Sequence, residues 1–303
     1  MCPERAPRAG MRLSLQSRWR IPYGPKWDPW VPELPDLTVV AEELAARATG
    51  RMVLEATAPA PILVRATPAE LAALAGTTLG SASRRGKFLL LPFERNGSPF
   101  RLLAANPMLA GRFWLLPDGK AKVRARTGLR LRFADGGELR YVDREMLGKL
   151  YLIAPDGLSA IPGWPEMGPD ADDPELTLEA FRQRIRRHPG ELKSLLRNAK
   201  FVAGIGNAYS DEILWDAQLA PLRRRSSLRP DEIDRLYASM RSVLEDAKGR
   251  VRELVPPDIQ EQHREFLKVH LRGGEPCPRC GKPLRQIGGD EATTFCRTCQ
   301  PPF

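Results

Sequence analysis

The sequence predicts an α+β protein, with a strand-rich N-terminal half and a helical C-terminal half. Between residues 52 and 143, short apolar or alternating runs are separated by Gly, Pro, Asn and Asp, a pattern typical of a β-sandwich or barrel. Between residues 177 and 249, apolar residues recur at helical spacing. The 303 residues suffice for two compact units. We expect an N-terminal β-sandwich that follows a long helix, a C-terminal helical domain and a terminal hairpin with four cysteines.

The first predicted helix covers residues 36–50, because Asp36 is a suitable N-cap, apolar residues follow at helical spacing, and Gly50 is a suitable end. The preceding run "PELPD" is expected to be extended, since Pro32 and Pro35 fix their φ angles and remove two amide donors. A proline-punctuated acidic run directly before a helix is typical of the start of a protein.

The predicted domain plan follows from changes in composition. The first segment is basic and lacks sustained periodicity, so we interpret it as a non-core extension or a mis-assigned start. A stretch rich in Pro, Gly and acidic residues indicates a linker after the strands. The plan is an extension at 1–31, a β-sandwich at 32–161, a linker at 162–176, a helical domain at 177–269 and a hairpin at 270–303.

The charge balance suggests a polyanionic partner without identifying it. Lys and Arg total 47 against 37 Asp and Glu, which gives a net charge of +10. No run approaches the roughly 18 apolar residues needed to span a bilayer. The first thirty residues also lack the apolar core of a secretory signal, so a cytoplasmic location is the default expectation.

Four cysteines predict a metal site. Cys277, Cys280, Cys296 and Cys299 form C-x₂-C-x₁₅-C-x₂-C, the spacing of a tetrahedral Cys₄ zinc site on a hairpin. The zinc ion would be structural, because four protein ligands leave no position open for water. The alternatives are two disulfides or four buried thiols, which a cytosolic setting and the paired spacing disfavour. Cys2 has no partner in this pattern.

The stretch Gly204-Ile205-Gly206-Asn207 predicts an anion-binding turn between two helices. Glycines allow positive φ and let backbone N–H groups converge, and the helix expected from Asn207 adds a partial positive end. A phosphate is a natural ligand for such a turn. The alternative is a pair of glycines with a purely structural role.

The residues "KSLLRNAKFVAGIGNAYSDEIL", 193–214, resemble the helix–two-turn–helix signature of the formamidopyrimidine-DNA glycosylase and endonuclease VIII family. "PELPD" at 32–36, "SRRGKFLLL" at 83–91 and the cysteine hairpin ending in "CQ" are similar to that family's other landmarks, in the same order. The resemblance implies a zinc-containing DNA glycosylase and abasic-site lyase, which binds double-stranded DNA with a damaged base or abasic site and needs no obligate protein partner.

The resemblance implies that Pro32 attacks C1′ of the damaged nucleotide to give a Schiff base, followed by strand cleavage. A free α-amine has a pKa of about 7.7 to 8.0, against about 10.4 for lysine, so more of it is nucleophilic at neutral pH. In this sequence the peptide bond to Val31 blocks Pro32. Either Val31 is the true start codon, read as Met and trimmed, or a protease removes the segment. The alternative is a genuine basic extension on a protein that has lost catalysis.

The resemblance also assigns roles to other residues. Glu33 would act as general acid on the sugar ring oxygen or the leaving base. Lys87, expected on a strand, would hold the phosphate beside the lesion, and Asn207 would bind another phosphate with the turn of Gly204 and Gly206. The plain alternatives are a surface glutamate and an exposed strand lysine.

Two loops depart from the family pattern. Asn106 replaces a histidine and Leu109 replaces a methionine in the first void-filling loop, while Glu145 and Leu147 replace an arginine and a phenylalanine in the second. Apolar Leu109, Met146 and Leu147 can still wedge into the base stack. If the comparison with the family's loop is shifted by one residue, Arg144 would take the place of the arginine that recognises the opposite base.

A third departure lies in the cysteine hairpin, where Glu291 stands at the family's phosphate-binding arginine. A carboxylate repels phosphate, so Lys282, Arg285 or Arg297 would have to take over, or the hairpin grips DNA less firmly.

Two further functional classes stay open. A catalytically inactive damaged-DNA-binding protein on the same fold would explain the blocked Pro32 and the altered loops, and fold alone does not separate it from an enzyme. A helix–two-turn–helix protein of RNA or ribosome metabolism would leave "PELPD" and Lys87 unexplained.

Overall fold

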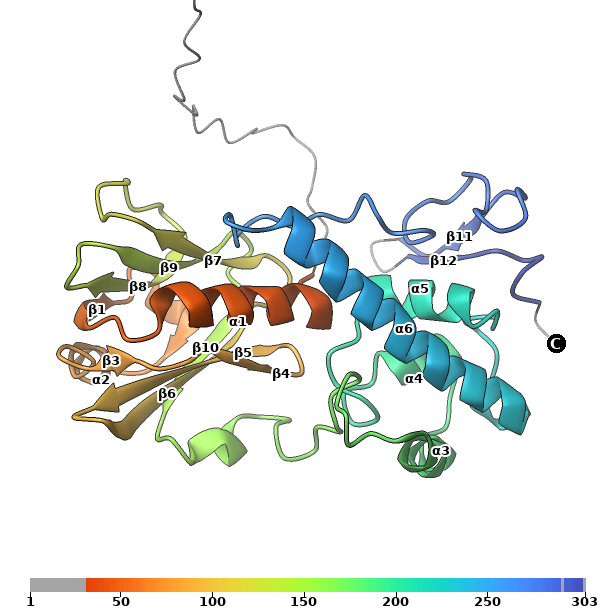
Figure 1. Ribbon diagram of the computed structural model, residues 1–303, viewed down its shortest axis with the longest axis horizontal. Helices are drawn as coiled ribbons and strands as arrows, with labels where there is room; N and C mark the ends of the chain where they lie inside the picture. Colours follow the sequence, from red (N-terminus) through yellow and green to blue (C-terminus); the bar gives the residue numbers. More distant parts are fainter. Residues whose placement is uncertain (1–30, 290–291, 302–303) are drawn as a thin grey trace, which may run out of the picture.

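The computed structural model describes residues 31–289 and 292–301. A strand-rich part and a helical part lie side by side, and two long helices cross at their junction (Figure 1). These helices are α1 (Leu34–Ala48) and α6 (Pro230–Leu254). The predictions made for residues 1–30 and for Glu291 lie outside the described residues.

The N-terminal part contains two sheets, which confirms the predicted strand-rich half. One sheet has the order β1-β8-β9-β7, and the other has the order β2-β10-β6-β5-β3 with β4 paired to β5. All pairs are antiparallel except β2 with β10. The strands are β1 (Val53–Thr57), β2 (Val64–Arg65), β3 (Thr78–Leu79), β4 (Ser83–Arg85), β5 (Phe88–Arg95), β6 (Ser98–Asn106), β7 (Gly111–Leu116), β8 (Thr127–Phe133), β9 (Glu138–Asp143) and β10 (Lys149–Ile153). The connections contain α2 (Pro68–Ala72) and the short 3₁₀ helices η1 (Pro61–Leu63) and η2 (Gly157–Ala160).

Helix α1 begins earlier than predicted, so the expectation that Asp36 is its N-cap was wrong. The N-cap is Glu33, and Pro35 lies in the first turn, where a proline costs no hydrogen bond. Asp36 instead completes a capping box, because the Glu33 N–H donates to Asp36 Oδ2 at 2.8 Å. The apolar face of α1, which includes Leu37 and Leu44, packs into the core between the strands.

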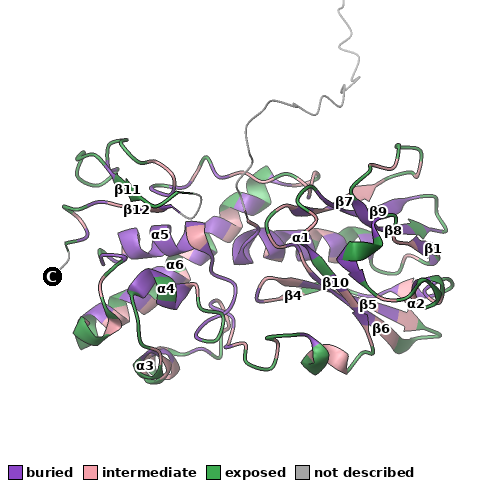
Figure 2. Ribbon diagram, turned by 180° about the vertical axis from the view of Figure 1, so that it is seen from behind, coloured by how far each residue is buried: buried purple, intermediate pink, exposed green. Residues whose placement is uncertain are grey.

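The C-terminal part is helical, as predicted, and has a second core. Its helices are α3 (Leu178–Arg187), α4 (Leu192–Leu196), α5 (Asn207–Asp216) and α6, with the 3₁₀ helix η3 (Arg225–Ser227) before α6. Leu34, the first residue of α1, belongs to this second core, whereas most of the buried face of α1 joins the first and Val39 packs with Val251 of α6. Helix α1 therefore connects the two parts, and Figure 2 shows α1 and α5 largely buried.

The chain ends in a small hairpin of β11 (Arg285–Ile287) and β12 (Thr293–Phe295). Its core consists of Leu284, Cys277 and Cys296 packed against Trp215 and Val269, which is too little apolar surface to fold alone. Within the described ranges, no helix has both the length and the apolar character needed to cross a bilayer.

Candidate functional site

The start of α1 is joined to the turn before α5. The carboxylate of Glu33 accepts hydrogen bonds from the backbone N–H groups of Gly206 at 2.5 Å, Ala208 at 2.9 Å and Tyr209 at 3.4 Å. The Leu34 N–H donates to the Gly204 carbonyl at 2.9 Å. The sequence predicted that this turn binds a phosphate, but in this arrangement its converging N–H groups bind an internal carboxylate.

The turn also lies against Lys87. A Cβ atom on Gly206 would lie 2.5 Å from Lys87 Nζ and 2.6 Å from Glu33 Oε1, so any larger residue would force one of these side chains to move. The sequence predicted that Lys87 lies on a strand. It lies instead in the two-residue turn that joins β4 to β5. Burial lowers the pKa of Lys87, while the charge of Glu33 acts in the opposite direction.

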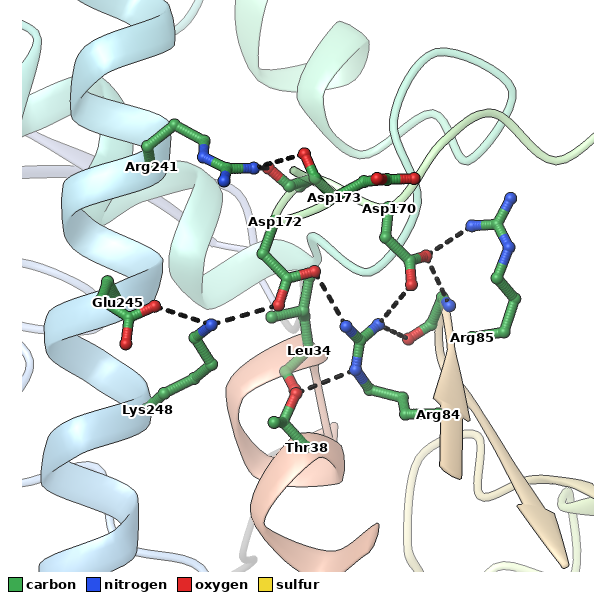
Figure 3. Close-up of polar contacts among 12 residues, drawn as sticks. Leu34, Thr38, Arg84, Arg85, Asp170, Asp172, Asp173, Arg241, Glu245 and Lys248 are labelled. Atoms are coloured by element: carbon green, nitrogen blue, oxygen red, sulfur yellow. Dashed lines mark hydrogen bonds and ion pairs between the residues drawn. The ribbon is translucent and has the colours of Figure 1, made fainter. Parts of the chain in front are cut away.

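The β4–β5 hairpin, which carries Lys87, is hydrogen-bonded to the linker between the two parts (Figure 3). One carboxylate, that of Asp170, accepts hydrogen bonds from Arg84 at 2.9 Å, from Arg85 at 2.5 Å and from the Gly86 N–H at 2.7 Å. Gly86 immediately precedes Lys87. The linker therefore fixes the base of the turn from which the lysine projects.

Arg84 extends this network to both long helices (Figure 3). Its guanidinium donates to Thr38 Oγ1 of α1 and to Asp172 Oδ1 of the linker, each at 2.9 Å. Asp172 in turn pairs with Lys248 of α6 at 3.3 Å. Because both arginine and aspartate side chains are largely buried, these contacts fix how the strand-rich and helical parts meet.

Arg264 approaches Pro32 from the segment after α6, and sequence reasoning missed it. Its Nη2 donates to Asp36 Oδ2 at 2.5 Å and to the Val31 carbonyl at 3.3 Å. A cavity of about 20 Å³, lined in part by Pro32, Asp36 and Arg112, lies beside these contacts. A volume of that size holds about one water molecule. No local motif singles out this arginine, because its partners lie more than two hundred residues away.

Asn207 begins α5 and faces the cysteine hairpin. Its Nδ2 donates to the Ala292 carbonyl at 3.2 Å, whereas its buried Oδ1 has no hydrogen-bond partner among the described residues. Asp211, one turn further along α5, accepts from Lys193 Nζ at 2.6 Å and from the Thr294 N–H at 3.1 Å. These contacts clamp β12 onto α5.

The two predicted void-filling loops lie at the same end of the sheets. The Tyr141 hydroxyl lies 3.4 Å from the Pro107 carbonyl of the first loop and 3.4 Å from Asp143 Oδ2 of the second. Asp143 shapes the second loop by accepting from the N–H groups of Glu145, Met146 and Gly148.

The side chains of these loops differ in exposure. Leu109 and Leu147 are 47% and 46% exposed, as an apolar wedge requires. Met146, predicted as a third wedge residue, instead packs against the N-terminal core. Arg144 is exposed, and Asn106 Oδ1 accepts from the Met108 N–H at 3.1 Å, so it shapes the first loop.

The four cysteines gather at the hairpin. The Sγ atoms of Cys277, Cys280, Cys296 and Cys299 all lie within 4.8 Å of one another, and all four are free thiols. A tetrahedral zinc ion with Zn–S bonds of about 2.3 Å holds its sulfur atoms roughly 3.8 Å apart. The Trp215 indole N–H donates to Cys277 Sγ at 3.3 Å, as expected of a group that stabilises a thiolate ligand. The residues therefore fit a four-coordinate metal ion.

Two family sequence models match the chain. The formamidopyrimidine-DNA glycosylase N-terminal domain matches residues 31–150, and the formamidopyrimidine-DNA glycosylase H2TH domain matches residues 167–252. The first match begins one residue before Pro32.

Whole-chain relatives agree. Formamidopyrimidine-DNA glycosylases of Symbiobacterium thermophilum and Heliobacterium modesticaldum are each 34% identical over 280 residues, which covers 89% of this chain and 90% and 100% of theirs. A crystal structure of Lactococcus lactis Fpg with DNA containing N7-benzyl-Fapy-dG superposes with a TM-score of 0.79 at 28% identity, over 89% of this chain and 100% of that one. The Lactococcus lactis enzyme with abasic-site DNA gives 0.78, also at 28% identity, over 89% and 99%.

A sandwich whose first helix is tied to a helix–two-turn–helix turn, with a lysine and a glutamate between them, thus defines a DNA glycosylase of base excision repair. Within that class, the chain belongs to the formamidopyrimidine-DNA glycosylase family.

Proposed function

We propose that the chain removes oxidised bases from double-stranded DNA and then cleaves the strand, with Pro32 as the nucleophile once its nitrogen is free. The observation that carries this proposal is the meeting of Glu33, the residue after Pro32, with Lys87 and Gly206 in one buried cluster. A nucleophile, a proton-transfer group and a phosphate-binding cation are the parts that such chemistry needs.

The reaction begins when the free amine of Pro32 attacks C1′ of the damaged nucleotide. The N–C1′ bond forms as the bond from C1′ to the base breaks, and the base leaves with a proton. Ring opening gives an iminium ion, which loses a proton from C2′ and expels the 3′-phosphate. We propose Glu33 as the group that transfers a proton to the ring oxygen or to the base. To donate, one of its carboxylate oxygens must first carry a proton, whereas in this structure both oxygens accept hydrogen bonds from backbone N–H groups.

DNA is held through phosphate contacts and a wedge. Lys87 is proposed to bind the phosphate beside the lesion and Asn207, with its unpartnered Oδ1 and its amide, the next one. The exposed Leu109 and Leu147 are proposed to fill the space left by an extruded base, with Arg144 near the opposite strand.

The metal ion is proposed to be a structural zinc ion on the four cysteines, supported by their close packing. It would hold the hairpin beside Asn207 and take no part in bond breaking. A cytoplasmic location stays a prediction.

The experiment compares the chain that starts at Pro32 with the full chain. Each is incubated with duplex DNA containing an abasic site or 8-oxoguanine, with borohydride present, and covalent adducts are counted by gel and mass spectrometry. We expect an adduct at Pro32 only in the chain whose amine is free. Absence of an adduct in both, with DNA binding retained, would favour the alternative, an inactive damaged-DNA-binding protein.

A further inference from the structure

Arg264 is a buried arginine with incomplete hydrogen bonding. It is 4% exposed, and its guanidinium lies 4.7 Å from the centre of the Tyr209 ring. Its Nη2 is bonded to Asp36 and Val31, but Nε and Nη1 are buried with no hydrogen-bond partner among the described residues. Burying hydrogen-bond donors without partners costs free energy, so packing alone does not explain why an arginine occupies this position.

The guanidinium lies close to the nitrogen of Pro32. Nη2 is 3.3 Å from the Val31 carbonyl oxygen, and that oxygen is two covalent bonds from the Pro32 nitrogen. With ordinary amide bond lengths, Nη2 is therefore within about 6 Å of the nitrogen atom. A charge at that separation in a buried site changes the protonation of an amine substantially.

The charge of Arg264 is only partly compensated. Among the residues that the structure describes, Asp36 Oδ2 is its single carboxylate partner, and the same oxygen also accepts the Glu33 N–H. Burial raises the pKa of Asp36, while the charge of Arg264 acts in the opposite direction. The pKa of Arg264 is itself raised despite burial, mainly by the charge of Asp36, so the guanidinium stays protonated. Among the described residues, charged groups also come from other elements: Glu33 at the N-cap of α1, Lys87 in the β4–β5 turn, and Arg197 after α4, whose charge acts on Lys87. Arg112 on β7 and Glu261, which is more than half exposed, line the same small cavity as Pro32.

We propose that Arg264 is a positioning residue for the nucleophile: it anchors the first turn of α1 through Asp36 and places a fixed positive charge beside the Pro32 nitrogen. The free amine is thereby kept unprotonated, and so reactive, at neutral pH. This inference rests on the proposed function of Pro32 and adds the residue that tunes it. Glu33, whose carboxylate accepts hydrogen bonds from α5 N–H groups, is the same in every variant compared below, so a shift between variants reports the Arg264–Asp36 pair.

The test uses Arg264→Gln in the chain that starts at Pro32. Single-turnover cleavage of abasic-site DNA is measured from pH 5 to pH 9, and the Pro32 amine is titrated separately by NMR with ¹³C-labelled proline. We expect both midpoints to rise by about one pH unit or more, so that the rate near pH 6 falls roughly tenfold while the rate at pH 9 changes little. Arg264→Lys should keep the original midpoints.

A purely structural role would lower the rate equally at every pH with both midpoints unchanged, and that result would overturn the proposal. Should Arg264→Gln fail to fold, Asp36→Asn serves instead: with Arg264 uncompensated, the midpoints should fall, and a rise would contradict us. Arg250→Gln, on the exposed surface of α6, is the matched control. If the unsubstituted chain from Pro32 forms no adduct at any pH, it is the proposed function that fails.

Discussion

Glu33 Oε2 accepts a hydrogen bond from the Gly206 N–H at 2.5 Å, across 173 residues of sequence. The Glu33 carboxylate therefore caps the start of α5, and Glu33 is also the residue directly after Pro32, the proposed nucleophile. A change in how the helical part meets the strand-rich part must move the residues proposed for catalysis, because Glu33 is hydrogen-bonded directly to the start of α5.

Substitution of Gly206 tests this contact. In Gly206→Ala, the added Cβ would lie 2.5 Å from both Glu33 Cδ and Lys87 Nζ, so one of them must move. We expect a loss of about 1–3 kcal/mol in the free energy of unfolding and at least tenfold slower adduct formation. Urea unfolding and borohydride trapping measure the two effects.

The matched control is Gly249→Ala in α6, where a new Cβ meets nothing within 4 Å. This substitution should be neutral or stabilise by up to about 1 kcal/mol, since alanine is the better helix former. Gly206→Ala with wild-type stability and activity would show that the cluster tolerates expansion.

Asp170→Asn tests the linker network. The substitution removes the charge that accepts hydrogen bonds from Arg84, Arg85 and the Gly86 N–H, and it leaves two arginines partly unpaired. We expect destabilisation of about 3 kcal/mol and weaker binding to abasic-site DNA, because the Lys87 turn loses its support. Asp156→Asn, at an exposed position, should change neither quantity by a measurable amount. Equal DNA affinity for both variants would contradict a positioning role for the network.

Much of the fold was predictable because it depends on local patterns. Short apolar or alternating runs form β5 to β9, and apolar residues recur at helical spacing in α3, α5 and α6. Such patterns identify the buried face of an element without any knowledge of what packs against it. The cysteine spacing predicted a cluster that the structure contains. The start of α1 was mispredicted because Asp36 is a good N-cap locally, while Glu33 becomes the cap only through contacts with α5.

The candidate site was predictable only where a motif carries it. Gly206 and Lys87 were found from sequence, but the fact that they touch was not, because nothing local relates a β-hairpin to a turn more than one hundred residues later. Arg264 was missed for the same reason. Its importance comes from burial beside Asp36, and an isolated arginine in a polar stretch gives no sign of burial.

The attachment of the cysteine hairpin gives a third prediction. Asp211 Oδ2 accepts from the Thr294 N–H and lies 2.7 Å from His270 Nδ1, while Oδ1 binds Lys193. In Asp211→Asn we expect β12 to lose hydrogen-exchange protection and DNA affinity to fall severalfold, because the hairpin is released from α5. Metal content should equal that of the unsubstituted chain, since the four cysteines are untouched. Asp246→Asn, exposed on α6, is the control, and unchanged protection of β12 in Asp211→Asn would refute the clamp.

The pH dependence of stability gives the last prediction, at the start of α6. Hydrogen bonds from Arg223 at 2.6 Å and 2.8 Å lower the pKa of Glu232 below its ordinary 4.5. Because the folded pKa lies below the unfolded one, the stabilisation is fully present above about pH 4.5 and is lost as the pH falls through the folded value. Glu232→Gln should therefore unfold about 3 kcal/mol more easily at pH 7, and the difference from wild type should shrink below pH 4.5.

Urea unfolding at a series of pH values measures this difference directly. Glu253→Gln, whose side chain is 67% exposed, is the control and should cost less than about 0.5 kcal/mol at every pH. A Glu232→Gln penalty that stays constant between pH 7 and pH 3.5 would mean that packing rather than charge holds this helix start. The sign is decisive, since a carboxyl whose folded pKa were raised would lose stability as the pH rises, the opposite of the trend expected for Glu232.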